Sequence, residues 1–269
     1  MRSYYDHDDQ PRESYLSFRS GWTSTIKGLI LANAAAYLVV LVLKGRFGRP
    51  EVYQWVGFYG PNFLRGAFWQ PVSYMFVHGG LWHLFVNMLG LFFFGGDVER
   101  RLGRASFLVM YFLCGLGGAM LSLLQGGATV IGASGGTLGV LVAFALLFPD
   151  VRIILFPIFI PIRARYIAVI YGFVTIAGLL GAGGDGIAHW AHLGGMVVAL
   201  VYLKCRPVGT RLLGLFRAGR LARRERRSAA EQAELDRILE KVHQDGITSL
   251  SNQERDFLNV CSRKYRDRH

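Results

Sequence analysis

Charged residues are scarce in this sequence, and the few that occur are unevenly distributed. Only 18% of the 269 residues are charged, whereas 52% are hydrophobic and the mean hydropathy is +0.31. Soluble domains contain about 25% charged residues. Long charge-free stretches alternate here with short basic clusters. This pattern argues against a soluble domain and is typical of a protein that crosses a membrane several times.

Cysteine is also rare, and its spacing argues against folds that are held together by disulfides or by a metal bound to cysteine. The three cysteines, Cys114, Cys205 and Cys261, lie far apart and form no CxxC motif, so neither a disulfide framework nor a thiolate metal site is expected. Cys114 lies in an apolar stretch, where we expect it to pack as a small core residue. No sequence feature points to a cofactor, and none is expected.

The net charge of +12 comes largely from one basic segment. Residues 204–227 contain nine basic side chains and one acid, Glu225, directly after the last apolar stretch. Basic residues in that position are explained by the positive-inside rule and by anionic lipid headgroups. We therefore expect the lipid bilayer as a partner and no nucleic acid, while the oligomeric state stays unspecified.

Six apolar stretches have the length of helices. They occupy residues 25–43, 80–94, 106–124, 135–148, 166–180 and 187–203. The fourth is shorter than the ~20 residues of a full crossing, and it begins after glycines around Ser134, so its first residues should lie below the membrane surface. Irregular backbone at that depth is tolerated only against protein or a water-filled cavity. The predicted fold is an all-α bundle of six transmembrane helices, with a cavity near Ser134.

Basic residues predict the orientation of the spans. Arginine clusters follow the second and fourth spans (residues 100–104 and 152–165), whereas the loops after the third and fifth spans contain no basic residue. Both termini are therefore expected in the cytosol. The first predicted external loop, residues 45–77, disagrees, because it is basic. Its many aromatic residues indicate a segment in the headgroup layer. The first 24 residues are polar and resemble no signal peptide, so we expect a bacterial cytoplasmic membrane.

The sequence divides into three parts. Residues 1–24 are expected to form an N-terminal cytosolic tail, residues 25–206 a six-span domain, and residues 207–269 a basic segment with a helical cytosolic tail. In that tail, apolar residues recur at helical spacing up to a glycine that ends the helix. Ser251 and Glu254 then form the pattern of a capping box, which predicts a second helix.

Polar side chains in the predicted spans are few, and each is a candidate functional group because such groups are costly in a bilayer. His83 and Asn87 lie in the second span, Ser134 opens the fourth, and His192 lies in the sixth. Under the predicted topology, all four lie in the external half of the membrane. No Asp or Glu lies in the middle of a span, which disfavours a paired-aspartate membrane protease.

The spacing of these groups indicates how they could meet. His83 and Asn87 are four residues apart, so they share one helix face. Glycines follow both Ser134 (Gly135) and His192, and small residues let two membrane helices approach closely. A hydroxyl and an imidazole within hydrogen-bond reach are what base-activated nucleophilic attack requires.

These motifs together resemble the rhomboid intramembrane serine proteases. The stretches that carry the resemblance are GASG with Ser134, AHLGG with His192, HGGLWHLFVN with His83 and Asn87, FWQPVSYMFVH (68–78) and FGGDVERRLG (94–103). The likeness extends over about residues 25–206. It implies a serine endopeptidase that cleaves peptide bonds in or near transmembrane segments of other membrane proteins.

The resemblance also implies a role for each candidate residue. Ser134 would be the nucleophile and His192 the general base, in a dyad without a carboxylate. The backbone N–H of Ser134 and the side chains of His83 and Asn87 would hold the oxyanion, where the loss of one donor costs about 3 kcal/mol. Gly132 would keep that backbone unobstructed.

Two positions depart from the pattern of the family. Trp69 is followed by Gln70 where the family often has an arginine, so an arginine contact to the loop or to lipid is absent. Leu138 stands where many members have an aromatic residue that stacks on the catalytic histidine. The support of His192 is therefore expected to differ here.

Two alternatives follow from the same residues. His78, His83, His189 and His192 could gather around one metal ion, which would make the protein a histidine-rich membrane metal protein. A non-catalytic rhomboid-like protein that binds client transmembrane helices is the other alternative. In the protease interpretation, His189 is expected near the external interface, in contact with solvent or headgroups, and His78 lines the entrance or shapes the first loop.

Overall fold

The computed structural model describes residues 22–125, 127–154, 160–181 and 187–266. The expected N-terminal tail, up to residue 21, lies outside the described residues. The chain forms two compact units, Met1–Cys205 and Arg206–His269.

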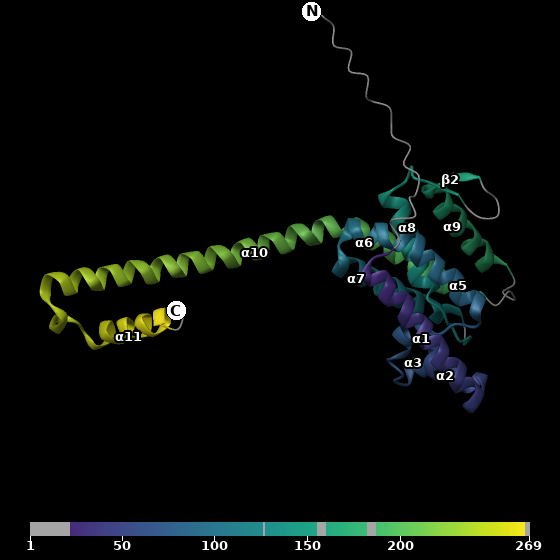
Figure 1. The fold of residues 1–269 in the computed structure, drawn as a ribbon, viewed down its shortest axis with the longest axis horizontal. Coiled ribbons are helices and arrows are strands. Elements are labelled where there is room, and N and C mark those ends of the chain that lie inside the picture. The colour runs from purple at the N-terminus through teal and green to yellow at the C-terminus, as the bar shows by residue number, and fades with distance from the viewer. Residues whose placement is uncertain (1–21, 126, 155–159, 182–186, 267–269) are drawn as a thin grey trace, which may run out of the picture. The chain divides into compact units, whose positions relative to one another are not determined.

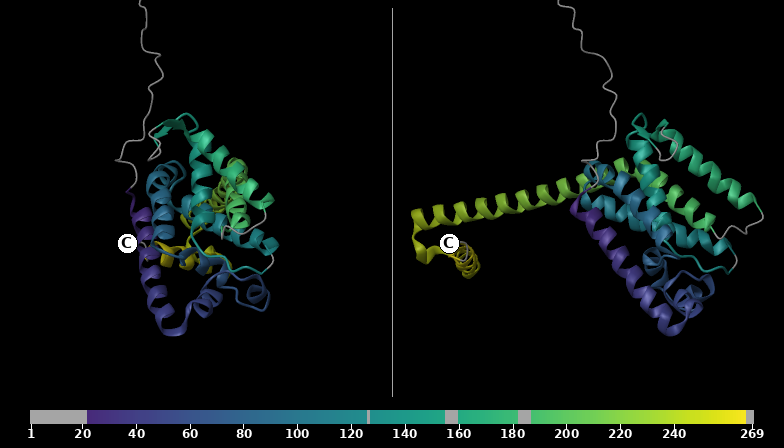
Figure 2. Two further views of the ribbon diagram at one scale, coloured as in Figure 1. Left: turned by 90° about the vertical axis from the view of Figure 1, so that its right-hand side faces the viewer. Right: turned by 45° about the vertical axis from the view of Figure 1, so that its right-hand side comes forward.

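The first unit is a bundle of helices (Figure 1). Its helices are α1 (Ser24–Phe47), α2 (Arg49–Val56), α3 (Gly60–Leu64), α4 (Gln70–Ser73), α5 (Leu81–Gly90), α6 (Gly96–Leu102), α7 (Arg104–Ser122), α8 (Ser134–Leu147), α9 (Ala164–Leu180) and the start of α10 (His189–Asp245). A π-helical turn, Leu91–Gly95, joins α5 to α6. Each apolar stretch predicted from the sequence is helical, apart from a few residues at its ends. In Figure 2, α1 and α9 lie on opposite sides of the bundle, and α8 contacts α5, α6, α7 and α9.

The outer surface of the bundle is apolar, as a membrane requires. Among the described helices, three are long and apolar enough to cross a bilayer, namely Ser24–Phe47, Leu81–Leu102 and Arg104–Gln125. α8 and α9 are shorter apolar helices. The 14 residues of α8 extend only about 21 Å at 1.5 Å per residue, less than the ~30 Å hydrocarbon core. Exposed side chains such as Val42, Val169 and Phe173 face outward, where lipid can cover them.

One element differs from the all-helical expectation. β1 (Arg152–Ile154) pairs antiparallel with β2 (Pro161–Arg163) in the loop between α8 and α9. The packing of α8 on α9 brings the two ends of this loop together, so short strands can pair there without a sheet around them. The sequence predicts only a basic loop here, because strands of three residues leave almost no periodic signal.

Glycines let three helices touch through their backbones. A Cβ atom added to Gly194 of α10 would lie 2.4 Å from the carbonyl oxygen of Gly117 in α7. A Cβ added to Gly195 would lie 2.0 Å from the carbonyl oxygen of Gly135 in α8. No side chain fits at these positions, so α10 approaches α7 and α8 as closely as membrane helices can.

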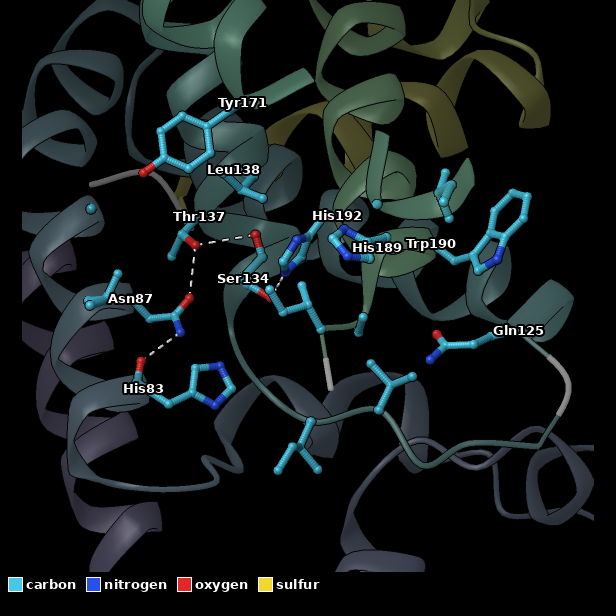
Figure 3. Close-up of a pocket in the computed structure, with 18 of the residues that line it drawn as sticks. His83, Asn87, Gln125, Ser134, Thr137, Leu138, Tyr171, His189, Trp190 and His192 are labelled. Atoms are coloured by element: carbon cyan, nitrogen blue, oxygen red, sulfur yellow. Dashed lines mark hydrogen bonds between the residues drawn. The ribbon is translucent and has the colours of Figure 1, made fainter. Parts of the chain in front are cut away.

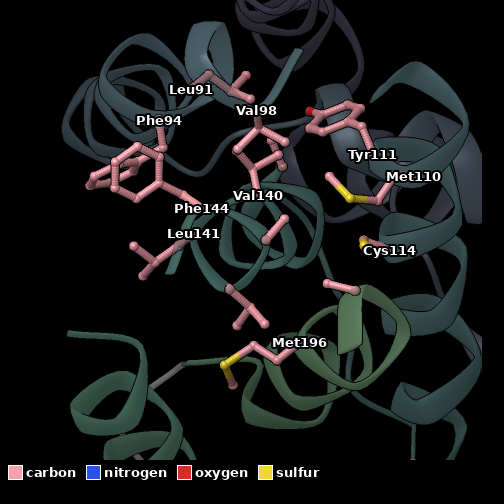
Figure 4. Close-up of a cluster of buried hydrophobic side chains, with 14 of the residues drawn as sticks. Leu91, Phe94, Val98, Met110, Tyr111, Cys114, Val140, Leu141, Phe144 and Met196 are labelled. Atoms are coloured by element: carbon pink, nitrogen blue, oxygen red, sulfur yellow. The ribbon is translucent and has the colours of Figure 1, made fainter. Parts of the chain in front are cut away.

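The hydrophobic core surrounds α8 (Figure 4). Val140 and Phe144 are buried on this helix. The ring of Phe144 packs 5.1 Å from that of Phe94, which follows α5. Cys114 of α7 is also buried, as its apolar surroundings predicted. α8 is therefore held from several sides, which gives its first residue a defined position.

The long loop after α1, which the sequence predicts to be external, has a folded structure of its own. Its aromatic residues are divided, because Phe58 is buried whereas Trp55 and Phe68 are exposed. Gln70, which stands where an arginine was expected, is fully buried. Its Nε2 donates to the carbonyl of Gln54 at 2.7 Å, and its Oε1 accepts from the Tyr59 N–H at 3.1 Å. The glutamine therefore joins parts of the loop that lie 11 and 16 positions before it.

A buried carboxylate ties α6 to the start of α1. Glu99 accepts hydrogen bonds from the hydroxyls of Thr23 and Thr25. Thr23 is also the N-cap of α1, because its hydroxyl accepts from the N–H of Ile26 at 3.1 Å. Hydrogen bonds of this kind are what allow a carboxylate to be buried.

The second unit contains a helical hairpin. α10 continues without a break to Asp245, and α11 spans Asn252–Arg266. The predicted capping box is confirmed, because the N–H of Ser251 donates to Glu254 at 2.9 Å and the N–H of Glu254 donates to the Ser251 hydroxyl at 3.3 Å. Glu254 also pairs with Lys241 of α10 at 3.0 Å. The continuity of α10 was not predicted from the sequence.

We expect Gly195→Ala to lower the free energy of unfolding by about 3 kcal/mol, the upper end for overpacked core positions. The added methyl group would overlap the Gly135 carbonyl and force α10 away from α8. The thermal midpoint in detergent micelles measures this effect. Gly172→Ala in α9 is the matched control, because nothing lies within 4 Å of its added Cβ. Equal midpoints for the two variants would contradict the packing argument.

We expect the helical hairpin to lose stability in acid. The pKa of Glu254 is lowered to about 2, chiefly because the Ser251 N–H donates to the carboxylate and also because Lys241 lies beside it. The carboxylate therefore stabilises the folded hairpin fully above its ordinary pKa of 4.5, and this contribution is lost as the pH falls toward 2. Hydrogen-exchange protection of the α11 amides should decrease across this range. Glu254→Gln should remove the decrease.

Candidate functional site

Two polar side chains from different helices meet inside the bundle. Ser134 is the first residue of α8, and His192 lies in the first turn of α10. The Oγ of Ser134 and the Nε2 of His192 are 2.8 Å apart, although the residues are 58 positions apart in the chain. Figure 3 shows the two side chains pointing toward each other. The contact of Gly135 with Gly195 lies directly beside this pair and explains how two helices bring them so close.

The pair lies in a cavity of about 1070 Å³. His83 and Asn87 of α5 line the same cavity, together with residues of α8, α9 and α10. All four polar residues singled out in the sequence therefore face one space. A cavity of this size can admit a stretch of polypeptide as well as water.

The ring of His83 is oriented by the backbone before its helix. The N–H of Gly79 donates to Nδ1 of His83 at 3.4 Å. A neutral imidazole that accepts at Nδ1 carries its proton on Nε2, and this nitrogen faces the backbone at Gly132. A Cβ atom at Gly132 would lie 2.6 Å from Nε2, and the φ of this residue is +119°. Both facts explain why a glycine is needed two residues before Ser134.

The side-chain amide of Asn87 donates one hydrogen bond and accepts another. Its Nδ2 donates to the carbonyl of His83 at 2.8 Å, and its Oδ1 accepts from the hydroxyl of Thr137 at 3.0 Å. Thr137 was not among the residues expected at the site. Its position one helical turn after Ser134 is a signal in the sequence that could have identified it, because residues three apart share a helix face.

Backbone hydrogen bonds to the first loop hold the segment that precedes Ser134 in place. Phe58 and Val130 exchange backbone hydrogen bonds at 2.8 Å in both directions. The N–H of Gly132 donates to the carbonyl of Tyr74 at 2.9 Å. These contacts join segments more than 50 residues apart, and nothing in the local sequence predicts them.

His78 also belongs to this support. Its side chain is fully buried, so it does not line an open entrance. Its Nε2 accepts from the N–H of Ala133, the residue before Ser134, at 3.5 Å. The sequence allowed His78 either to line the entrance or to shape the first loop. The structure favours a structural role, next to the serine.

The expectation for His189 was wrong. Its side chain is 7% exposed and packs against α9, where a Cβ atom at Gly178 would lie 2.2 Å from the ring. Its ring lies edge-on to that of His192, with 6.2 Å between the centroids. The missing side chain of Gly178 makes room for the ring, so His189 is buried between α9 and α10 instead of being exposed to solvent or headgroups. His192 thus has the imidazole of His189 beside it. Leu138, at the position where many rhomboid proteases have an aromatic residue, offers no ring to His192.

The metal-protein alternative requires several of the histidines to gather around one ion. Within the described ranges of the chain, no three His, Cys, Asp or Glu side chains are grouped closely enough to hold a metal ion. The alternative of a histidine-rich metal protein therefore has no cluster to support it in this part of the chain.

Comparisons with known proteins agree with the sequence resemblance. A family model described as the rhomboid domain matches residues 65–206, more than half of the chain. A second model, a family of unknown function (DUF6576), matches residues 223–264, which include most of α11 and the end of α10.

Curated relatives come from several eukaryotes. Rhomboid protein 1, mitochondrial, of Saccharomyces cerevisiae is 34% identical over 134 residues, 47% of this chain and 38% of the relative. Rhomboid-like protein 16, chloroplastic, of Arabidopsis thaliana is 26% identical over 214 residues, 71% of this chain and 64% of the relative. Rhomboid-like protease 3 of Toxoplasma gondii is 30% identical over 123 residues, 45% of this chain and 47% of the relative.

The matches thus span less than two thirds of the length of these relatives. The domain match nevertheless includes α5 to α9 and the part of α10 that carries His192. The chain is therefore a membrane protein that belongs to the rhomboid family.

Proposed function

We propose that this protein is an intramembrane serine endopeptidase that cleaves peptide bonds in or near transmembrane segments of other membrane proteins. The observation that carries the proposal is the distance of 2.8 Å between Ser134 Oγ and His192 Nε2 inside a shared cavity. A nucleophile and its base need this reach. The names of the relatives, one of which is called a protease, support the same class of activity.

In the proposed reaction, Nε2 of His192 takes the proton of the Ser134 hydroxyl as Oγ bonds to the carbonyl carbon of the peptide. The tetrahedral intermediate collapses when His192 returns that proton to the leaving nitrogen and the C–N bond breaks. A water molecule then attacks the acyl ester with His192 again as the base. The ester C–O bond then breaks as His192 gives the proton of that water to Oγ of Ser134, so the product leaves with a new carboxyl group and the enzyme is unchanged.

The negative charge that develops on the carbonyl oxygen needs donors placed in advance. His83 is suited to this role because the Gly79 N–H occupies Nδ1 and leaves the proton on Nε2, near Gly132. Asn87 offers Nδ2, and the backbone N–H of Ser134 lies at the start of α8. Gly132 supports this arrangement by leaving room for the ring of His83, and Gly135 by letting Gly195 of α10 approach.

The proposal includes six membrane spans, with both termini in the cytosol. It rests on the six apolar stretches, the arginine clusters in two loops, and the basic residues after the sixth stretch. The relatives named above are eukaryotic, and two are named mitochondrial or chloroplastic. They give no support to the bacterial membrane predicted from the sequence, so the proposal extends to the membrane and the orientation only.

We expect Ser134→Ala and His192→Ala each to reduce cleavage of a model transmembrane substrate by more than ~10³-fold, because residues of one dyad act as a unit. A fluorophosphonate probe should label the wild-type protein in detergent and leave Ser134→Ala unlabelled. Both variants should still insert into the membrane. Undiminished cleavage by Ser134→Ala would end the proposal, and an intact wild type without labelling or cleavage would favour the non-catalytic binder of client helices.

We expect His83→Ala and Asn87→Ala to lower kcat by about 10²–10³-fold each, with little change in KM, because each removes one donor to the oxyanion. Some activity should remain, in contrast to the dyad variants. Steady-state cleavage of the same substrate in micelles measures both parameters. A rise in KM at constant kcat would instead assign these residues to substrate binding.

A further inference from the structure

Thr137 makes a contact that neither the dyad nor the proposed oxyanion donors account for. It lies on α8 one turn after Ser134, and its side chain is 8% exposed. Its hydroxyl is 3.0 Å from Oδ1 of Asn87 and 3.2 Å from the carbonyl oxygen of Ser134. Threonine side chains in helices often bond to the preceding turn. The shorter distance, however, joins α8 to α5 at the cavity (Figure 3).

The partners of Asn87 decide which way its amide points. The carbonyl of His83 lies 2.8 Å from one end of the amide, and a carbonyl can only accept, so this end must be Nδ2. The other end is then Oδ1, which needs a donor. The hydroxyl of Thr137 is that donor, since an amide rotated by 180° would place two oxygens against each other at His83.

We infer that Thr137 is a positioning residue for the oxyanion hole: it holds the amide of Asn87 so that Nδ2 faces the reacting carbonyl oxygen. The inference rests on the proposed function. An amide nitrogen carries two protons, so one goes to the His83 carbonyl and the second serves the oxyanion. Asn87 and Thr137 are both buried, and a buried polar network of this kind is rigid when every member is satisfied.

Removal of the Thr137 hydroxyl should destabilise the transition state and leave substrate binding unchanged. Thr137→Val keeps the shape of the side chain and leaves Oδ1 of Asn87 without its donor, so the amide can turn away from the cavity. Because the oxyanion exists only in the transition state, kcat should fall about 10-fold and KM should stay the same. The loss is smaller than for Asn87→Ala, because the amide itself remains.

The experiment compares Thr137→Val, Thr137→Ser and Thr175→Val in full-length protein with one transmembrane substrate. Thr137→Ser keeps the hydroxyl and should stay within about 3-fold of the wild-type kcat. Thr175→Val removes the hydroxyl of another buried threonine, on α9, which does not line the cavity, and should leave kcat unchanged. In an Asn87→Ala background, Thr137→Val should have no further effect, because the group that it positions is gone.

The possible outcomes distinguish a failure of the inference from a failure of the proposed function. If the wild type is neither labelled by the fluorophosphonate nor active, the proposed function fails, whatever Thr137 does. If the wild type is active and Thr137→Val has the same kcat, or if its 10-fold loss persists beside Asn87→Ala, the inference is overturned. Should Thr137→Val not fold, as judged by its thermal midpoint, Thr137→Ser decides alone: a loss of more than 10-fold in a folded protein would overturn the inference.

Discussion

The backbone contact of α10 with α7 and α8 is the constraint on which the rest of the structure depends. In a bilayer, apolar side chains gain little by leaving lipid, so helices associate through close van der Waals contact at small residues. Gly194 and Gly195 let α10 reach the carbonyl oxygens of Gly117 and Gly135 without any side chain between them. Ser134 and His192 lie beside this contact, and their separation of 2.8 Å follows from it. A larger residue at either glycine of α10 would separate the helices and the two side chains together.

Around this contact, backbone groups orient the polar side chains. The N–H of Gly79 donates to Nδ1 of His83, and the carbonyl of His83 accepts a hydrogen bond from the Asn87 amide and so sets its orientation. Such partners need no reorganisation during a reaction, which is the condition under which donors to a developing charge are most effective. Beside His192, the ring of His189 lies edge-on and fills the space that Gly178 leaves open.

Much of the fold was predictable, because membrane helices are long and uniformly apolar and because local patterns mark their ends. The apolar stretches and the capping box at Ser251 were read correctly for this reason. The folded first loop, the β1–β2 hairpin and the burial of Gln70 were not, since each depends on partners that lie far away in the chain. His189 shows the limit well: its distance from the helix end suggested a headgroup contact, whereas a glycine on another helix decides that it is buried.

By itself, the sequence determined that this is a helical membrane protein of the rhomboid family, and it singled out the serine, histidines and asparagine that face the cavity. Composition and short motifs carry that information because hydrophobic length and residue type are local properties. Only the tertiary structure decided which of these groups touch, which ring nitrogen and which end of an amide face the cavity, and that Thr137 joins them. Hydrogen bonds between residues 50 or more positions apart, such as that of Thr137 with Asn87, depend on how the helices pack, and packing is a property of the whole bundle.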